Sequence, residues 1–416
     1  MAPELSAFHA DDAPAVRRLL ELSPELKARI NDPIGPFNSP IITQVRSRTM
    51  LDVLLDAGAN IDVRSEWWAG GFGLLDTASP DLAAYAIERG ATITVHAAAR
   101  LGLMDKLRAM ISADPSLVAA RGGDGQTPLH FASTVEIADY LLDNGADINA
   151  RDVDHVSTPI QYMVRKRPDV ARHLVCRGGQ ADILAAAALG DIDPARQLLD
   201  ADPESIRMRV SDEYFAMVGG PNGGTIYQWE LGWHVSAVQV TSTFGHLKMF
   251  DFLLERCPAE EKLLNACWLH DESMVRELLA EEPDLATRLS PAGRRQLAHA
   301  ARNNDTTAAA LMLEAGLPVN TYSQHHATPL HWAAWHGNLE MVRLILPRKP
   351  SLDDTSNDYK GSPVDWAIHG SENGWDRRKS DYGSVLELLF GAGGPLPEQI
   401  GGTEPVQAVL RSHGVF

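Results

Sequence analysis

The sequence predicts an all-α repeat protein, because one short motif recurs along its 416 residues. The clearest copy runs from Thr328 to Leu346: Thr-Pro-Leu-His opens a helix of small residues, Gly337-Asn338 closes it, and an amphipathic helix follows. A second copy begins at Thr127-Pro128-Leu129-His130 and ends at Asn144-Gly145. Helix-turn-helix units of similar length bury their apolar faces on one another, so we expect a solenoid in which each repeat packs only on its neighbours.

Both copies resemble the ankyrin repeat, which has a period of about 33 residues and the signature Thr-Pro-Leu-His-x-Ala. The resemblance implies about twelve helix-turn-helix repeats joined by finger loops. It also implies that the tetrapeptide ties each finger to its helix through side-chain hydrogen bonds, so His130 and His331 are expected to be structural. Alanine pairs let the inner helices approach closely, and glycine provides the left-handed helix cap.

The repeats are expected to form one continuous solenoid over residues 1–416. Residues 1–35 resemble a capping repeat, repeats occupy 39–207 and 236–393, and residues 394–416 close the stack. Residues 208–235 interrupt the pattern and are expected to form one long central finger hairpin. The repeats open near Ser39, Gly73, Val95, Thr127, Thr158, Ile183, Ser236, Asn265, Leu297, Thr328 and Ser362.

Charge and composition argue against several classes of partner. The net charge is −18 and the pI about 5.2, so the chain lacks the excess of basic residues that nucleic acids and anionic membranes attract. No apolar run approaches the roughly 18 residues of a membrane span, and no secretory leader is expected. Cys176, Cys257 and Cys267 are widely spaced, which favours reduced core residues and a cytoplasmic location. No cofactor is expected.

Two irregular stretches before residue 236 depart from the repeat pattern. Arg64–Gly73 contains Trp67 and Trp68, and Asp76 then stands where the structural histidine is expected. In the long finger, the Gly-Gly-Pro-Asn-Gly-Gly run at 219–224 predicts a hairpin turn, and the alternation around Tyr227 and Trp229 is typical of a strand. We expect this finger to fold over the concave face and wall a pocket, with Trp229 and its aromatic neighbours partly buried; a mobile surface loop is the alternative.

The third irregular stretch lies near the C-terminus, where His325 and His326 precede Trp332 and Trp335, and Asp365 stands at the His331 position one repeat later. The spacing of these histidines and Asp365 matches no zinc motif, so no metal site is expected.

Two functions remain open. The first is a binding module that holds a protein or peptide partner on its concave face. The alternative is an enzyme (a hydrolase or lyase) or a small-molecule or carbohydrate binder, with a pocket between the long finger and the groove; the oligomeric state stays open. The candidate ligand-binding residues are Trp67, Trp68, Tyr227, Trp229, Trp233, His325 and Trp335. The candidate catalytic residues are Asp76, Glu230, His234, His326 and Asp365.

Overall fold

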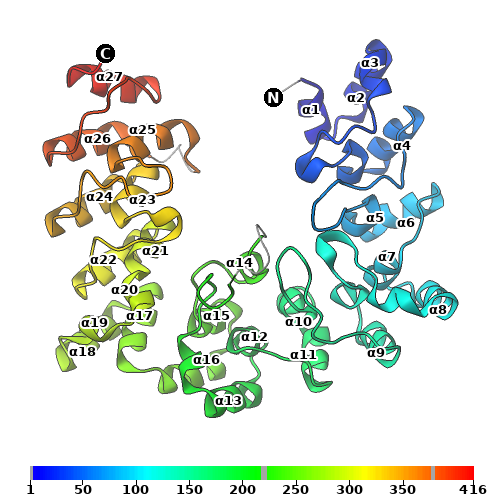
Figure 1. Ribbon diagram of the computed structural model, residues 1–416, viewed down its shortest axis with the longest axis horizontal. Helices are drawn as coiled ribbons and strands as arrows, with labels where there is room; N and C mark the ends of the chain where they lie inside the picture. Colours follow the sequence, from blue (N-terminus) through cyan, green and yellow to red (C-terminus); the bar gives the residue numbers. More distant parts are fainter. Residues whose placement is uncertain (1–2, 217–222, 376–379) are drawn as a thin grey trace. The chain divides into compact units, whose positions relative to one another are not determined.

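The fold is all-α. A computed structural model describes residues 3–216, 223–375 and 380–416. Within these ranges the chain forms helices and turns, and its only β-type pairings are two isolated bridges, Gly35 with Ser39 and Arg209 with Ser236. The chain divides into two compact units, Met1–Val240 and Thr241–Phe416 (Figure 1). The sequence-based fold class is therefore confirmed at the level of helical repeats, whereas the count of twelve and the single continuous solenoid stay predictions.

The N-terminal unit consists of short helices joined by loops. Its α-helices and 3-10 helices are α1 (Pro3–His9), α2 (Ala13–Leu22), α3 (Pro24–Ala28), η1 (Pro36–Asn38), η2 (Ile41–Gln44), α4 (Arg48–Asp56), α5 (Leu74–Thr77), α6 (Pro80–Glu88), α7 (Val95–Arg100), α8 (Met104–Ala113), η3 (Pro115–Ala119), η4 (Gly123–Gly125), η5 (Pro128–Phe131), α9 (Val135–Asp143), α10 (Pro159–Met163), α11 (Pro168–Cys176), α12 (Ile183–Leu189), α13 (Ile192–Ala201), η6 (Pro203–Arg207) and α14 (Tyr227–Glu230).

The boundary between the units falls within α15 (Ala237–Phe244). The helices of the C-terminal unit are α16 (Leu247–Arg256), α17 (Ala259–Trp268), α18 (Glu272–Glu281), α19 (Leu285–Arg288), α20 (Pro291–Arg294), α21 (Gln296–Arg302), α22 (Thr306–Glu314), η7 (Gln324–His326), α23 (Pro329–Trp335), α24 (Leu339–Ile345), η8 (Leu346–Arg348), α25 (Pro363–Asn373), α26 (Tyr382–Gly391) and α27 (Glu404–Ser412). None of the helices in the described part of the chain has the length and apolar character needed to cross a lipid bilayer.

The Thr-Pro-Leu-His motif starts α23 as predicted. The Thr328 side chain accepts a hydrogen bond from the His331 amide, and the His331 ring accepts one from the Thr328 amide, at 3.4 and 3.3 Å. The other ring nitrogen of His331 donates to the carbonyls of Asp354 and Gly361 in the next finger, at 3.0 and 3.1 Å. The histidine thus satisfies backbone groups at a helix start and fastens the neighbouring loop, which confirms its structural role.

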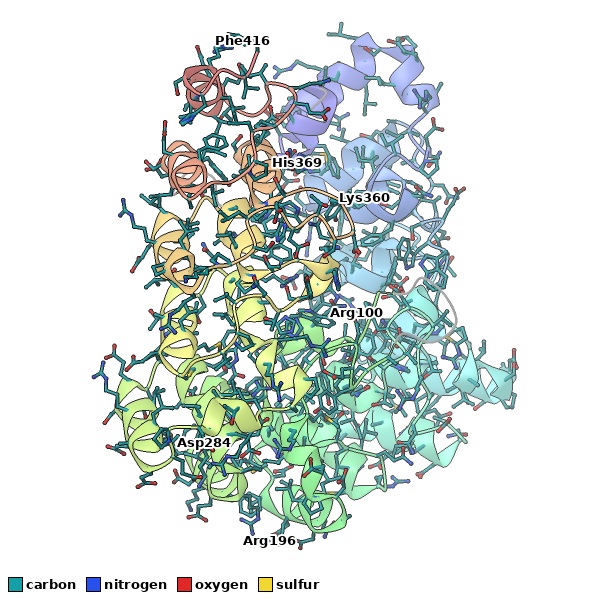
Figure 2. All side chains as sticks on the ribbon, turned by 60° about the vertical axis from the view of Figure 1, so that its left-hand side comes forward. Arg100, Arg196, Asp284, Lys360, His369 and Phe416 are labelled. Atoms are coloured by element: carbon teal, nitrogen blue, oxygen red, sulfur yellow. The ribbon has the colours of Figure 1, made fainter. Side chains whose placement is uncertain are left out.

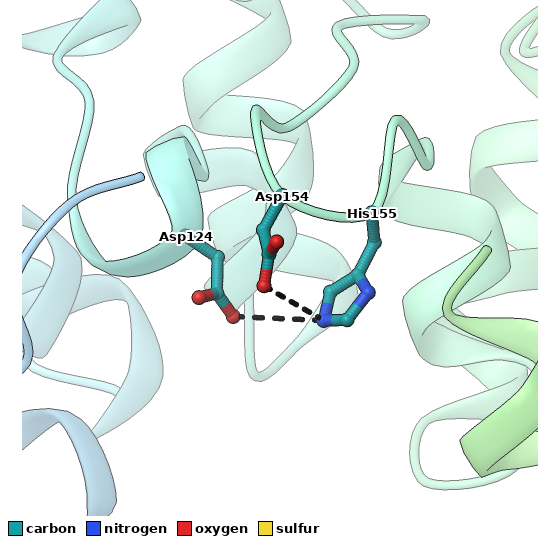
Figure 3. A group of neighbouring side chains, drawn as sticks. All are labelled: Asp124, Asp154 and His155. Atoms are coloured by element: carbon teal, nitrogen blue, oxygen red, sulfur yellow. Dashed lines mark ion pairs between the residues drawn. The ribbon is translucent and has the colours of Figure 1, made fainter. Parts of the chain in front are cut away.

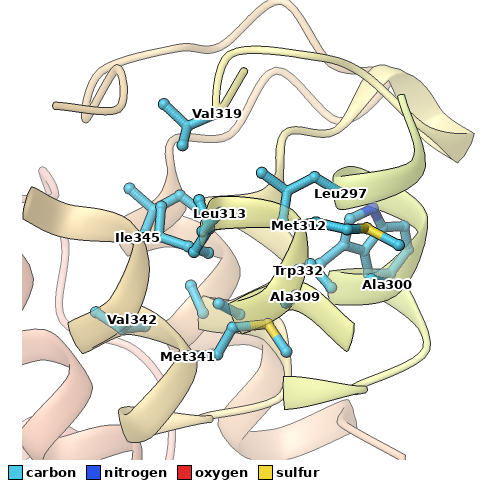
Figure 4. Packing of buried hydrophobic residues seen from close by; sticks show 14 of the residues in the cluster. Leu297, Ala300, Ala309, Met312, Leu313, Val319, Trp332, Met341, Val342 and Ile345 are labelled. Atoms are coloured by element: carbon cyan, nitrogen blue, oxygen red, sulfur yellow. The ribbon is translucent and has the colours of Figure 1, made fainter. Parts of the chain in front are cut away.

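The apolar core of the C-terminal unit forms where inner helices stack (Figure 4). α23 packs between α21 and α25, and alanines on these helices, such as Ala300 and Ala333, are fully buried. Because alanine adds only one carbon beyond the backbone, the helix axes approach closely. Met312, Met341 and Ile345 on the outer helices cover the other side. This stacking fixes the spacing of the loops and helix faces that build the site described below.

Three expectations differ from the structure. Trp229 is 72% exposed and not partly buried as expected. Tyr227–Glu230 form the short helix α14 and not a strand, because the Leu231 and Glu230 amides bond back to the carbonyls of Tyr227 and Ile226. Residues 219–222 of the expected turn lie outside the described residues. Cys176 is exposed near the end of α11, so only Cys257 and Cys267 are core residues.

Candidate functional site

An open cavity of about 450 Å³ lies among the fingers and inner helices of the C-terminal unit. Aromatic rings, one carboxylate and two imidazoles form its wall. The lining residues are His325, Trp332, Trp335, Tyr359, Gly361, Asp365, Trp366, His369 and Trp375.

Two stacked helices and two finger loops position these side chains. Trp332 and Trp335 are three residues apart on α23, which places them on one helical face. Asp365, Trp366 and His369 come from α25, and Figure 2 shows His369 on this helix. One oxygen of Asp365, Oδ2, accepts hydrogen bonds from the Ser362 amide and hydroxyl, both at 2.7 Å. This capping geometry holds the carboxylate in place at the cavity wall.

The tryptophans contact one another mainly edge to face. The Trp332 and Trp366 ring centroids are 5.1 Å apart at 85°, and Trp375 lies 5.9 Å from Trp332 and 6.1 Å from Trp335. This arrangement is favourable for aromatic quadrupoles, and it leaves ring faces available to a further group. Arg302 already uses this property, because its guanidinium carbon lies 5.7 and 5.6 Å from the Trp332 and Trp375 centroids.

Part of this aromatic surface faces solvent. Tyr359 and Trp375 are 66% and 62% exposed, whereas Trp332 and Trp366 are buried beneath them. The Trp335 indole nitrogen is buried and finds no hydrogen-bond acceptor among the described residues. A buried N–H without an acceptor is costly, so one at a cavity wall indicates a place where a ligand supplies the acceptor.

A second cavity, of about 810 Å³, lies in the N-terminal unit. Phe37 and Trp67 meet edge to face at 4.8 Å on its wall, and Trp229 lines it as well. The loop carrying Gly70, the loop carrying Asp124 and the loop carrying Asp154 are joined there, because the Asp124 amide donates to the Gly70 carbonyl and its carbonyl accepts from the Asp154 amide.

Comparison with known families agrees with this architecture. A family model of ankyrin repeats in three copies matches residues 263–358, and a model of the single ankyrin repeat matches residues 124–153. The chain carries ankyrin repeats. Ankyrin repeats are in general protein-interaction modules. The search of curated proteins finds no match to this chain.

The predicted ligand-binding residues of this ankyrin-repeat chain divide between the two cavities. Trp67 and Trp229 line the cavity of the N-terminal unit, and His325 and Trp335 line that of the C-terminal unit. The other three line neither: Trp68 is exposed, Tyr227 is fully buried and Trp233 is half-buried. Their part in binding stays a prediction.

Of the candidate catalytic residues, only Asp365 lines either cavity. Asp76 pairs with Arg64 at 2.7 Å and Glu230 with Lys166 at 2.6 Å, and both carboxylates are buried. The remaining two are histidines with different surroundings. His234 is buried, whereas His326 is exposed and stacks on Tyr322 with centroids 3.9 Å apart. The structure does not gather these residues into one group, and a catalytic role stays untested.

Several residues at the cavities were not among the candidates, although Trp366 and Trp375 belong to the third irregular stretch of the sequence. Tyr359, Trp366 and Trp375 belong to the aromatic wall of the C-terminal unit, and Asp124, Asp154 and His155 belong to the N-terminal cavity. The second group could have been found by aligning the repeats, because Asp124 and His155 occupy the same finger position, three residues before Thr127 and Thr158. Figure 3 shows this group of three side chains.

Proposed function

We propose that this protein is a binding module whose C-terminal unit anchors a peptide segment of a partner through one basic side chain. The observation that carries the proposal is the meeting of four tryptophans, Tyr359 and Asp365 around one open cavity. The family resemblance supports the module itself, and the chemistry of the cavity wall supports the kind of side chain. Cytoplasmic location and binding on a concave face are parts of the same proposal.

A cation gains free energy over an aromatic face, by about 0.5–1 kcal/mol at exposed sites and about 2 kcal/mol when desolvated. The guanidinium of Arg302 lies near two rings of this same cluster, so the rings already accept a cation. Asp365 supplies the opposite charge at the wall. The net charge of −18 also favours approach of a basic partner, since long-range attraction raises the association rate.

The cavity also has features of a binding hot spot. Tryptophan and tyrosine are enriched among residues that dominate interface energies, and here Trp375 and Tyr359 are available at the surface. The indole N–H of Trp335 offers a donor to a backbone carbonyl of the partner. An anchored side chain and one backbone hydrogen bond together would fix the direction of an extended peptide.

Peptide titration followed by tryptophan fluorescence tests the proposal. The probe is a short peptide with one lysine among uncharged residues, compared with the same peptide carrying methionine, which has a similar shape and no charge. We expect the lysine peptide to bind at least tenfold more tightly. Asp365→Asn, which retains an acceptor for the α25 cap, should weaken lysine binding severalfold, and Trp335→Ala should weaken it more.

Trp229→Ala in the N-terminal unit serves as the matched control and should leave the affinity unchanged. Equal binding of both peptides, or affinity insensitive to Asp365→Asn and Trp335→Ala, would contradict the proposal.

A small-molecule binder is the second candidate, and the cavity of the N-terminal unit favours it. Trp67 and Trp229 flank this cavity, and the polar side chains of Ser39, Gln44 and Ser65 line it. If the finger of residues 208–235 walls this cavity, Trp229 would cover the ligand. Its side chain is available for that contact, because Trp229 is 72% exposed in the free chain. A metabolite thermal-shift screen tests this: a stabilising ligand should lose its effect in Trp229→Ala, and the absence of any stabilising ligand would count against the idea.

A further inference from the structure

We infer that Asp124, Asp154 and His155 form a site for a divalent transition-metal ion of the zinc or manganese type. The three residues project from two neighbouring finger tips of the N-terminal unit (Figure 3). One donor atom from each lies within 4.8 Å of the others. His155 Nε2 is 3.7 Å from Asp154 Oδ2 and 3.9 Å from Asp124 Oδ2.

The backbone holds the three donors together. The carbonyl oxygen of Asp124 accepts hydrogen bonds from the Val153 and Asp154 amides, at 2.8 and 3.1 Å, which joins the two finger tips. The Gly223 amide donates to Asp154, both to its carbonyl at 2.9 Å and to Oδ1 at 2.8 Å. A third segment of the chain therefore braces the site, and Oδ2 of Asp154 remains directed toward His155.

The protonation of His155 follows from its other ring nitrogen. Nδ1 lies 2.8 Å from the carbonyl oxygen of Gly224, and a carbonyl can only accept, so Nδ1 carries the hydrogen. In the neutral ring, Nε2 then presents a lone pair toward two carboxylate oxygens. Three electron-rich atoms that face one point repel one another, and a positive charge between them, from an added proton or from a metal ion, relieves that repulsion. A histidine that donates its second N–H to a backbone carbonyl is also the usual arrangement around a bound metal.

The distances fit an ion better than a shared proton. A hydrogen bond from Nε2 to a carboxylate is roughly 2.7–3.2 Å long, shorter than either observed separation. Ligand atoms that each lie about 2.0–2.2 Å from one ion in a tetrahedral arrangement are separated by roughly 3.3–3.6 Å. The measured separations of 3.7 and 3.9 Å are slightly longer, so the side chains would move a little closer together around a bound ion.

The surroundings leave the two carboxylates short of positive charge. The Asp124, Asp154 and His155 side chains are 15%, 7% and 11% exposed. Within the described ranges, His155 is the only ion-pair partner of either carboxylate; Arg46 lines the same cavity but lies beyond ion-pair distance of both. Burial makes an ionised carboxylate costly there, and a bound cation would offset that cost.

A separate observation points to a ligand at this place. The Trp67 indole nitrogen is buried near Asp124 and makes no hydrogen bond of normal geometry within the described chain. Its N–H would donate to an oxygen bound next to Asp124. The cavity of about 810 Å³ opens beside the three donors, so a water molecule or an oxygen-donor ligand could complete the coordination.

Isothermal titration of the metal-free full chain with Zn²⁺, and separately with Mn²⁺, tests the site. We expect binding of one ion per chain, and a loss of affinity of tenfold or more in both Asp124→Asn and His155→Gln. His270→Gln is the matched control, because His270 also faces a carboxylate, that of Asp305 at 2.9 Å, but is exposed and has no second acidic partner in the described residues. It should bind as the unaltered chain does.

Two further readouts keep the test decisive. Circular dichroism establishes that each variant is folded, and Asp124→Asn, which preserves the shape of the side chain, stands in if His155→Gln fails to fold. Anomalous X-ray scattering from crystals grown with Zn²⁺ should place the ion among the three side chains. No ion bound per chain, unchanged affinity in the folded variants, or an ion located elsewhere would overturn the assignment.

Discussion

The hydroxyl group of Tyr227 lies 3.0 and 3.1 Å from the two carboxylate oxygens of Asp182, the residue that caps α12. Tyr227 belongs to the irregular segment before α15, and its side chain is fully buried. Asp182 also accepts hydrogen bonds from Gln161 and from the Ala185 amide, at 3.1 and 2.8 Å. The contact thus fastens an inserted segment to the cap of a regular helix.

Tyr227→Phe should lower the free energy of unfolding by about 1.5–3 kcal/mol, because it removes a hydrogen bond to a charged group at little cost in packing. Urea unfolding measures the change. Trp229→Phe, two residues along and 72% exposed, is the control and should stay within about 0.5 kcal/mol of the unaltered chain. If Tyr227→Phe leaves the free energy of unfolding unchanged, the segment is not anchored through this hydrogen bond.

Because of His130, the free energy of unfolding should decrease at acidic pH. Burial lowers the pKa of this histidine to about 3, and its Nδ1 accepts from the Thr127 amide while Nε2 donates to the Ser157 carbonyl. In the unfolded chain the His130 imidazole binds a proton with a pKa near 6.5, whereas in the folded chain it stays neutral until the pH approaches 3. The stability that the neutral ring provides is therefore complete above pH 6.5 and declines as the pH falls toward 3. At pH 5 the loss amounts to about 2 kcal/mol.

His130→Gln tests that relationship, because Gln161 already performs the same capping role in the next repeat, accepting from the Thr158 amide at 2.9 Å. The variant should flatten the dependence of unfolding free energy on pH between 7 and 5, measured by urea unfolding at each pH. An identical slope in both proteins would contradict the assignment of a neutral, buried His130.

Gly145→Val should destabilise the protein by about 1 kcal/mol or more. Gly145 follows α9 with φ of +94°, and an added Cβ would meet nothing within 4 Å, so the cost arises from the backbone conformation alone. Gly391 provides the matched case, since it lies in α26 with equal open space and without a positive φ. Gly391→Ala should raise stability by about 0.4–1 kcal/mol; melting temperatures that move in the same direction for both would refute the argument.

Asp76 should stabilise the folded chain. Its side chain is 2% exposed, pairs with Arg64 at 2.7 Å and accepts from the Gly73 amide at 2.8 Å. Asp76→Ala should cost about 2–3 kcal/mol, because it leaves a charged group and a helix-start amide without their acceptor. Glu66→Ala on the neighbouring exposed surface should change stability by less than about 0.5 kcal/mol. A stable Asp76→Ala variant with altered ligand binding would instead support the catalytic-site hypothesis.

The sequence predicts the helical repeats well because the repeat motif is local. Thr328 and His331 form their hydrogen bonds within one turn, so the tetrapeptide alone predicts the contact. The Tyr227 segment could not be predicted in this way. Its apolar alternation suggests a strand, but a strand needs a partner to receive its backbone hydrogen bonds, and the segment forms a helical turn held by Asp182.

At the candidate sites, too, residues that are neighbours within one repeat could be predicted, whereas contacts between segments far apart in the sequence could not. Trp332 and Trp335 stand out because they are neighbours on one helix, and Asp365 because it replaces a histidine in the motif. The contribution of Tyr359 and Trp375 depends on how loops return over the helices, which the spacing of residues does not encode. Asp124 and His155 meet only because successive fingers stack, so neither residue is distinctive within its own repeat.

The measurement that tests the central claim most directly is a nuclear magnetic resonance titration of the tryptophan indole N–H signals with the lysine-bearing peptide. We predict that the signals of Trp332, Trp335, Trp366 and Trp375 shift together, with Trp335 moving downfield as its N–H gains an acceptor. The signals of Trp67 and Trp229 should stay in place. Shifts confined to Trp67 and Trp229, or no shift at saturating peptide, would contradict the account of a peptide-anchoring aromatic cavity in the C-terminal unit.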